Sequence, residues 1–347
     1  MLTRRHALLA AAAAAAMARP ALAQTSAPKP YQPSPELAEA ARKEGRCVMY
    51  TASFTEPEQE FIDHFNKRFP YVKVELVRAS GGQLITRVRT EAAAGKLVAD
   101  IVDHSDRALM KSIDEIFQDY APPNAADYLE GARISPKLWP RITPTWCIAY
   151  NTELAKTPPK TWMDLTKKDV YGPGVIGEVI APSGGTTWTR IMFERQKVDP
   201  DYWAKQAATK PALYPSSAPG SDAVVRGEVQ IMPLVVNAIY SKRRDGAPVE
   251  LVFPTEGIPL VPYASGIPKT SANPNAARLY LDYCLSPEGQ AFTMTQHGNL
   301  TSLKVPPGAI KGYDPKVTPV WLPKQDEFDQ LRNTWIEEWN KTYGYRQ

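Results

Sequence analysis

The first half of the chain alternates between short apolar runs and stretches with helical spacing. The apolar runs lie at 46–51, 72–77 and 99–102, and a polar turn follows each of them. Between the first two runs, the apolar residues of 61–69 recur every three or four positions, as in an amphipathic helix. A second helical stretch, 84–94, separates the last two runs. This order predicts an open parallel sheet with covering helices.

The second half contains a further α/β unit. Extended apolar runs lie at 142–151, 174–181 and 249–263, and helical stretches lie at 276–292 and 328–339. A chain of 347 residues exceeds what one compact core commonly holds. The predicted fold class is therefore α/β, with two bodies rather than one.

The first 23 residues have the layout of a secretory signal peptide. A basic start is followed by an alanine-rich apolar run at 7–17 and by the small-x-small sequence Ala21-Leu22-Ala23. Residues 24–44 are expected to form a leader ahead of the fold. The adjacent Arg4-Arg5 fits a twin-arginine signal as well as an ordinary secretory signal, so the export route stays open.

Composition narrows the range of partners. The formal charge of +4 includes three arginines of the signal peptide, so the mature chain is close to neutral, which argues against nucleic acid. No later stretch approaches the roughly 20 apolar residues of a membrane span, so stable membrane insertion is not expected. Cys47, Cys147 and Cys284 are an odd number, so they are either buried apolar residues or include a single disulfide.

Three polar turns stand where open α/β sheets bind ligands, beyond the carboxyl ends of strands and at the starts of helices. They lie at 51–54, 79–82 and 183–187. Free N–H groups at helix starts attract anions, and glycines let backbone approach a ligand closely. The alternative is that these are ordinary caps and turns. The candidate ligand-binding residues in them are Ser53, Phe54, Ser80, Gly81, Ser183, Gly184, Thr186 and Thr187.

Four further candidates lie outside these turns. His104 and Ser105 follow a predicted strand, so we expect them to face the same cleft as the turns. Tyr240 and Tyr263 are aromatic residues that we expect to clamp an organic ligand. The competing interpretation is a surface or cap position for His104 and core positions for the two tyrosines.

Four segments, in their order after an export signal, resemble the solute-binding proteins of the ferric-iron family and its relatives for organophosphates, thiamine and polyamines. They are 71–97 with its serine–glycine turn, 146–165 with IAYNTELAKTPPKTWMDL, 227–231, and 276–298 with AARLYLDYCLSPEGQAFTMTQHG. The resemblance covers about residues 44–340, and the order of the segments makes it specific.

The resemblance implies a type II periplasmic-binding-protein fold. Each of two lobes would contain an open, mostly parallel sheet with flanking helices, and the ligand would lie in the cleft between them. Closure about a hinge is a known motion of such proteins. The expected boundaries are 45–143 plus 255–298 for lobe 1, 146–252 plus 299–347 for lobe 2, and crossings near 143–150 and 250–263.

The resemblance also implies a function. A member would capture a small-molecule ligand in the periplasm, as a monomer without a cofactor, and deliver it to the permease and ATPase of an ABC importer. Iron-binding members carry an Asn-x-Tyr-Tyr stretch whose adjacent phenolates bind the metal, whereas this chain has Asn237-Ala238-Ile239-Tyr240. Because Ile239 supplies no oxygen, we expect no metal site and favour an anionic or zwitterionic organic solute, phosphorylated solutes included. Ferric iron remains the alternative, and Asn237 joins the candidate residues.

Signals for an enzyme are weak. Residues 172–177 fit G-x-G-x-x-G, but a polar run precedes them and a strand follows, the reverse of a dinucleotide site. After the signal peptide, the histidines are His64, His104 and His297, without metal-ligand spacing. We therefore expect no catalysis, and keep a Ser–His–Asp enzyme and a periplasmic sensor partner as alternatives.

Overall fold

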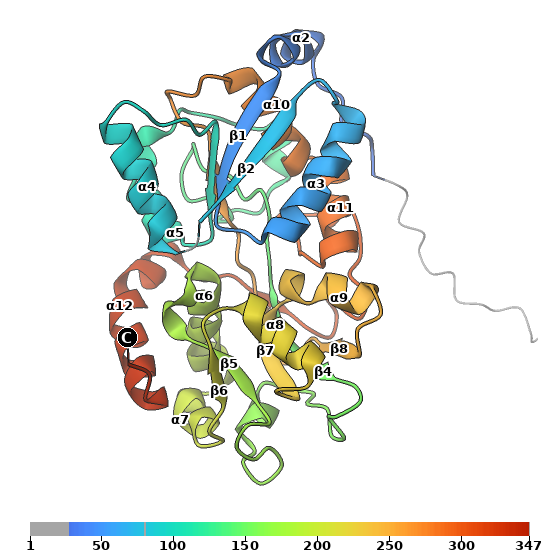
Figure 1. Ribbon diagram of the computed structural model, residues 1–347, viewed down its shortest axis with the longest axis vertical. Coiled ribbons are helices and arrows are strands. Elements are labelled where there is room, and N and C mark those ends of the chain that lie inside the picture. The colour runs from blue at the N-terminus through green and yellow to red at the C-terminus, as the bar shows by residue number, and fades with distance from the viewer. Residues whose placement is uncertain (1–27, 80, 347) are drawn as a thin grey trace, which may run out of the picture.

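The computed structural model describes residues 28–79 and 81–346 (Figure 1). The predicted signal peptide, the first residues of the leader and Ser80 therefore lie outside the described residues. The described chain forms two bodies, one above the other in Figure 1. We call the upper body lobe 1 and the lower body lobe 2.

Lobe 1 is built on a four-stranded sheet of order β10-β3-β1-β2. β1 is parallel to both of its neighbours, with Met49 opposite Leu76 on one side and Ile101 on the other. β10 runs antiparallel to β3. The three parallel strands confirm the sheet predicted from the first half of the chain. The strands are β1 (Arg46–Thr51), β2 (Lys73–Arg78), β3 (Ile101–His104) and β10 (Ala264–Gly266).

Helices cover both faces of this sheet. Because successive side chains of a strand point to opposite faces, Cys47 and Met49 pack in one buried cluster with α3 and α10, whereas Val48 and Tyr50 pack in another with α4. The helices of lobe 1 are α2 (Pro35–Glu44), α3 (Thr55–Arg68), α4 (Gly82–Ala93), α5 (Arg107–Lys111), α10 (Pro274–Leu285) and α11 (Pro287–His297).

Lobe 2 contains five strands. β4 lies between β7 and β8 and is antiparallel to both, while β5 and β6 pair in parallel. A parallel bridge from Ile176 to Ile231 places β5 beside β7. The strands are β4 (Trp146–Asn151), β5 (Gly177–Val179), β6 (Ala212–Tyr214), β7 (Ile231–Val235) and β8 (Val249–Val252).

One strand in each lobe runs antiparallel to its neighbours, which the expected mostly parallel arrangement allows. These strands, β4 and β10, are the ones that enter directly from the other lobe, so they run against their neighbours. The segments that precede them lie side by side: Tyr263 N donates to Ile142 O at 3.0 Å, and Val261 N donates to Pro144 O at 2.9 Å. The two segments predicted to cross between the lobes thus lie side by side. The exact lobe boundaries remain a prediction.

The core of lobe 2 is rich in tryptophan. Trp146, Trp162 and Trp188 are fully buried there, and Trp339 of the C-terminal helix joins them. The last helix therefore packs as part of lobe 2. The remaining elements are α6 (Gly185–Phe193), α7 (Tyr202–Ala207), α8 (Ser217–Arg226), α9 (Tyr240–Arg244), α12 (Gln325–Tyr343), and the short paired strands β9 (Ile258–Pro259) and β11 (Val320–Trp321).

The cysteines and the described helices bear on two further expectations, a disulfide and a membrane span. Cys47, Cys147 and Cys284 are buried free thiols. Among the described helices, none combines the length and the apolar character that crossing a membrane requires.

Candidate functional site

Four helices begin where the lobes face each other. α3 and α4 follow β1 and β2, whose carboxyl ends lie at the same edge because the strands are parallel. In lobe 2, α6 follows β5 and α8 follows β6. In these four described helices, the N-cap residues Phe54, Gly81, Gly184 and Ser216 make no side-chain capping bond. Their first N–H groups and the positive ends of the helix dipoles favour a negatively charged group.

A cavity of about 440 Å³ separates the lobes beside two of these helix starts. We call it the interlobe cavity. Its volume lies within the range of pockets that hold small organic molecules. Both lobes contribute to its wall: Phe54, Thr55, Glu56, Pro57 and Arg78 from lobe 1, and Ala218, Ser221, Asp222, Asn237, Ala238, Ser241 and Lys242 from lobe 2.

Two buried polar atoms, one on a residue of the cavity wall and one on the residue before the wall residue Phe54, lack a hydrogen-bond partner within the described part of the chain. They are Oδ1 of Asn237, which lines the cavity, and Oγ of Ser53, which directly precedes Phe54. The two side chains belong to residues only 3% and 1% exposed. A buried polar group without a partner costs about 1–3 kcal/mol. A bound molecule toward which both side chains turn would remove that cost.

The wall of the cavity carries both signs of charge. Arg78 donates from Nε to the backbone oxygen of Ser53 at 3.1 Å. Lys242 binds Oγ of Ser221 at 2.9 Å and forms an ion pair with Asp222. Arg78 and Lys242 suit an anionic group, while Glu56 and Asp222 suit a cationic one.

The lobes also meet at a glycine turn in lobe 2. A Cβ atom on Gly185 would lie 2.4 Å from the backbone oxygen of Ser105 and 2.6 Å from Cα of Asp106. Only glycine permits this approach. Ser105 Oγ lies 4.0 Å from the position of a Cβ on Gly184, and Thr186 O accepts a bond from Trp146 Nε1 at 3.0 Å. The structure thus brings Ser105 and the predicted turn 183–187 together, with Ser183 at the end of a short helical turn and Thr187 buried.

His104 has a different role from the one predicted. Its Nδ1 atom lies 2.8 Å from the backbone N–H of Asp106 and must accept that bond. Its Nε2 atom lies 2.9 Å from the backbone oxygen of Gly81, so it carries the proton and donates. Burial lowers the pKa of this histidine, in keeping with a neutral ring. Both ring nitrogens are occupied, so His104 fixes the Gly81 turn rather than binding a ligand.

The two tyrosines do not line the interlobe cavity. Tyr240 packs against Gly298, and its hydroxyl accepts a bond from Lys311 N at 3.4 Å. Tyr263 is buried and its hydroxyl bonds to Ser105, while burial raises its pKa. Neither tyrosine thus lines the interlobe cavity, and Tyr263 contacts Ser105 instead, while a role for either as a clamp stays a prediction. Ser80 lies outside the described residues.

Sequence reasoning missed a buried ionic cluster beneath the site. Arg141 binds both oxygens of Glu58 at 2.9 and 2.7 Å, and it also binds Asp103 at 2.9 Å. Asp103 accepts a bond from Thr51 Oγ1 at 2.7 Å, and Thr51 Oγ1 accepts one from Ser53 N at 3.0 Å. This chain of contacts connects the Ser53 turn to the start of the crossing segment. Arg141 is 83 and 38 residues from its partners in sequence, so no local pattern marks it.

The described residues contain no group of three or more histidine, cysteine, aspartate or glutamate side chains that could hold a metal ion. Ile239, which stands where iron binders have a phenolate, is fully buried in the core of lobe 2. The residues present therefore do not fit a ferric site of that type.

Two α/β lobes with a polar cavity between them define a periplasmic-type binding protein. The chain belongs to the bacterial extracellular solute-binding protein family, whose sequence profile matches residues 51–291. The type II periplasmic-binding-protein fold predicted from the sequence is confirmed. Members of this family bind solutes for ABC-type transporters, and the family and fold indicate a periplasmic or extracellular location.

Three relatives show how far the similarity reaches. The protein y4fP of Sinorhizobium fredii, a probable ABC transporter periplasmic-binding protein, is 35% identical over 116 residues, which cover 31% of each chain. The structure of the periplasmic binding protein AfuA from Actinobacillus pleuropneumoniae, with exogenous fructose-6-phosphate bound, covers 87% of this chain and 99% of its own at 21% identity and a TM-score of 0.71. Apo ferric ion-binding protein A from Pasteurella haemolytica covers 87% and 99% at 15% identity and a TM-score of 0.68.

Proposed function

We propose that this protein is the periplasmic solute-binding component of an ABC importer, and that it captures a small anionic or zwitterionic organic solute between its lobes. The observation that carries the proposal is a cavity with walls from both lobes and two buried polar atoms, on Ser53 and Asn237, that lack partners within the described chain. The solute would then pass to the permease and its ATPase.

The chemistry of the site supports an organic anion. Free helix starts and Arg78 supply donors for a carboxylate or phosphate. The Oδ1 atom of Asn237 can only accept, so it selects a solute that also presents a hydroxyl or ammonium donor. Asp222 and Glu56 extend the range to zwitterions. Phosphorylated solutes are included, since AfuA, which shares the fold, was solved with fructose-6-phosphate.

The residues proposed to surround the solute come from the turns at the lobe boundary. Ser53 and Asn237 would bond to it directly, Phe54 would contact its apolar part, and backbone N–H groups at Gly81 and Gly184 would face its anionic part. Ser105 and Tyr263 would hold the back of the cleft. The remaining members of this set, still predictions, are Ser80, Ser183, Thr186 and Thr187.

Capture would proceed by closure of the lobes. A solute that contacts both walls of the cavity binds the closed form better than the open form, so it shifts the population toward closure. The importer would recognise the closed form. Because the site needs no reacting group for this task, we propose binding without catalysis.

A thermal-shift panel tests the proposal. The panel contains fructose 6-phosphate, inorganic phosphate, citrate, spermidine and ferric citrate, each added to the purified mature protein. We expect at least one organic anion or zwitterion to raise the melting temperature, because a ligand at 100 times its Kd stabilises the folded form by about 2.7 kcal/mol. A shift with ferric citrate alone, absent with citrate, would favour iron instead. No shift with any small solute would contradict the proposed function.

A further inference from the structure

Ion pairs between buried or half-buried side chains join the lobes at two places away from the interlobe cavity. The first links the C-terminal helix to lobe 1: Arg332 of α12 binds Asp106, with Nη2 at 2.8 Å and Nε at 3.0 Å from Oδ2. The carboxylate is 1% exposed. The C-terminal part of α12 packs on lobe 2, where Trp339 is fully buried, whereas Asp329 near its start pairs with Lys111 of α5 in lobe 1 at 3.4 Å. Arg332 is therefore a side chain held by one lobe and bonded to the other.

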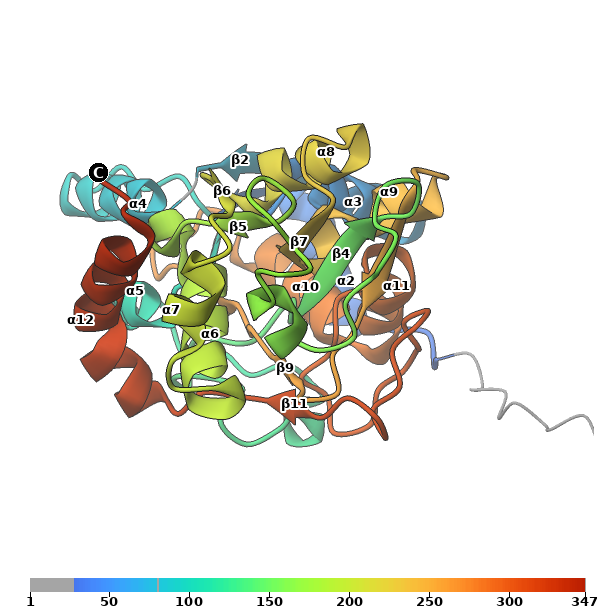
Figure 2. The ribbon, with the colours of Figure 1, turned by 90° about the horizontal axis from the view of Figure 1, so that it is seen from below.

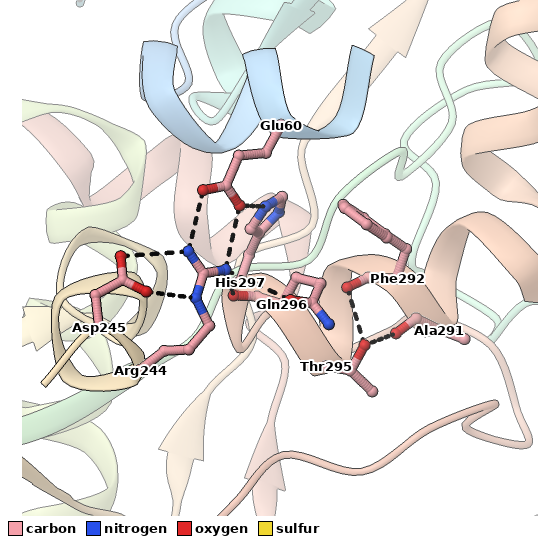
Figure 3. A network of polar contacts seen from close by, with 8 residues as sticks. All are labelled: Glu60, Arg244, Asp245, Ala291, Phe292, Thr295, Gln296 and His297. Atoms are coloured by element: carbon pink, nitrogen blue, oxygen red, sulfur yellow. Dashed lines mark hydrogen bonds and ion pairs between the residues drawn. The ribbon is translucent and has the colours of Figure 1, made fainter. Parts of the chain in front are cut away.

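The second ion pair lies on the other side of the boundary. Arg244 of α9, in lobe 2, binds both oxygens of Glu60 of α3, in lobe 1, at 3.1 and 3.2 Å (Figure 3). Glu60 is also 3.1 Å from His297 Nε2 at the end of α11, and Arg244 also binds Asp245 beside it. Figures 1 and 2 both place α12 and α5 at one edge of the lobe boundary and α9 and α11 at the other.

We propose that Arg332 and Arg244 are latches that hold the lobes closed and set the affinity for the solute without touching it. Neither arginine lines the interlobe cavity. Each ion pair connects side chains on different lobes, so hinge opening would separate the charges. The part of this inference that concerns affinity rests on the proposed function.

The expected signature follows from population shift. A latch stabilises the closed form whichever solute is bound, so its loss reduces the fraction of closed protein available to every solute alike. The dissociation constants of different solutes should then rise by one common factor. A residue that contacts the solute would instead change the ratio of those constants.

Two matched controls are available on the same helices. Glu338 of α12 pairs at 2.6 Å with Arg195, which lies in lobe 2 as well. Arg243 of α9 pairs with Glu250, also within lobe 2. The variants Glu338→Gln and Arg243→Ala each remove an ion pair without removing a contact between lobes.

The first experiment needs no solute. Small-angle X-ray scattering of the ligand-free protein would compare the wild type, the double variant Arg332→Ala/Arg244→Ala and the two controls. We expect a larger radius of gyration for the double variant and unchanged values for the controls. Arg332→Gln, which keeps much of the side-chain length, replaces Arg332→Ala if circular dichroism shows a loss of helix. An unchanged radius in the folded double variant would overturn the inference.

The second experiment measures affinity by calorimetry with fructose 6-phosphate and with inorganic phosphate, or with any other solute positive in the thermal-shift panel. Each latch variant should raise Kd by about two- to tenfold, as expected for partly exposed to buried ion pairs, and by the same factor for every solute that binds. Factors that differ between solutes would overturn the inference while leaving the proposed function intact. If no solute binds the wild type, the proposed function fails, and scattering alone decides whether the latches exist.

Discussion

Asn237 carries a buried acceptor that no group of the described chain satisfies. Asn237 lines the interlobe cavity, the residue is 3% exposed, and its Oδ1 atom is buried. An arrangement of this kind lowers the stability of the empty protein and becomes favourable only when a donor from outside occupies the cavity. We therefore regard Asn237 as a residue kept for binding rather than for folding.

The variant Asn237→Leu tests this interpretation. It should weaken solute binding about tenfold or more, because the solute's donor would be left without an acceptor. Its melting temperature without solute should equal or exceed that of the wild type, because the unpaired buried atom is gone. Calorimetry and thermal melts would measure the two effects.

Asn151 provides the matched control. Its amide donates to Val224 O at 3.0 Å and its Oδ1 atom accepts from Glu153 N at 3.0 Å, so its side chain is fully engaged. Asn151→Leu should lower the melting temperature. If Asn237→Leu also destabilises the empty protein and leaves affinity unchanged, Asn237 is structural and our assignment is wrong.

At the scale of elements, the turn before α6 is constrained by its approach to lobe 1. Gly185→Ala would place a methyl group 2.4 Å from the backbone oxygen of Ser105, which forces the turn and the opposing lobe apart. We expect solute affinity to fall about tenfold to a hundredfold, because a shift of about 1 Å at a binding site has effects of that order. Gly172→Ala is the control, since nothing lies within 4 Å of the position its Cβ would take. Equal affinity in both variants would show that the contact does not shape the site.

A second element-scale feature links β5, α6 and the segment after it. Arg190 of α6 binds Glu178 of β5 and Glu194, and all three side chains are buried in lobe 2. Burial raises the pKa of Glu194 to about 8, and it raises that of Glu178 as well. One guanidinium thus faces two carboxyl groups, so burial favours the protonated form of one of them.

This cluster predicts how stability depends on pH. The folded protein binds a proton that the unfolded chain releases above the ordinary carboxyl pKa, so the free energy of unfolding should fall as pH rises toward 8. The slope contributed is at most about 1.4 kcal/mol per pH unit. Glu194→Gln should flatten it between about pH 6.5 and 8.5, where Asp282, whose pKa burial raises to about 6, is already ionised. Chemical denaturation at several pH values would measure this slope, and equal slopes in wild type and variant would contradict the assignment.

Local sequence patterns were enough to predict the strands and helices whose buried side chains repeat with a fixed period. The strands around Cys47, Leu76 and Ile101 and the helix containing Phe61 were predicted because burial on one face imposes that period. The same reasoning placed the glycine turn near 184 at the edge of a sheet. It could not foresee the backbone partners of Tyr240 and His104, because a hydroxyl or ring nitrogen bonded to backbone looks in sequence like one free for a ligand.

At the scale of the molecule, the two-lobed arrangement followed from length and from the order of segments, whereas the geometry of the site did not. The contacts that fix the lobes and the crossing segment around the site join residues remote in sequence, such as Glu60 with Arg244 and Asp103 with Arg141. The first pair depends on how one lobe sits on the other. The second depends on where the crossing segment lies against lobe 1. No local period encodes that placement, so it had to come from the structure.

The antiparallel strand β10 has a consequence for how the chain folds. It completes the lobe 1 sheet by pairing with β3, yet it follows strands β4 to β8 of lobe 2 along the chain. Strands β4 to β8 of lobe 2 are thus inserted between two parts of lobe 1, whereas α12 joins lobe 2 at the end of the chain, and the inserted strands can pair while β3 still has an open edge. Such an edge invites pairing with other chains, and closure over so long an intervening segment is slow. A growing polypeptide that stops short of Ala264 should therefore aggregate through β3. Synthesis must pass that residue before the open edge of the lobe 1 sheet can be covered by β10.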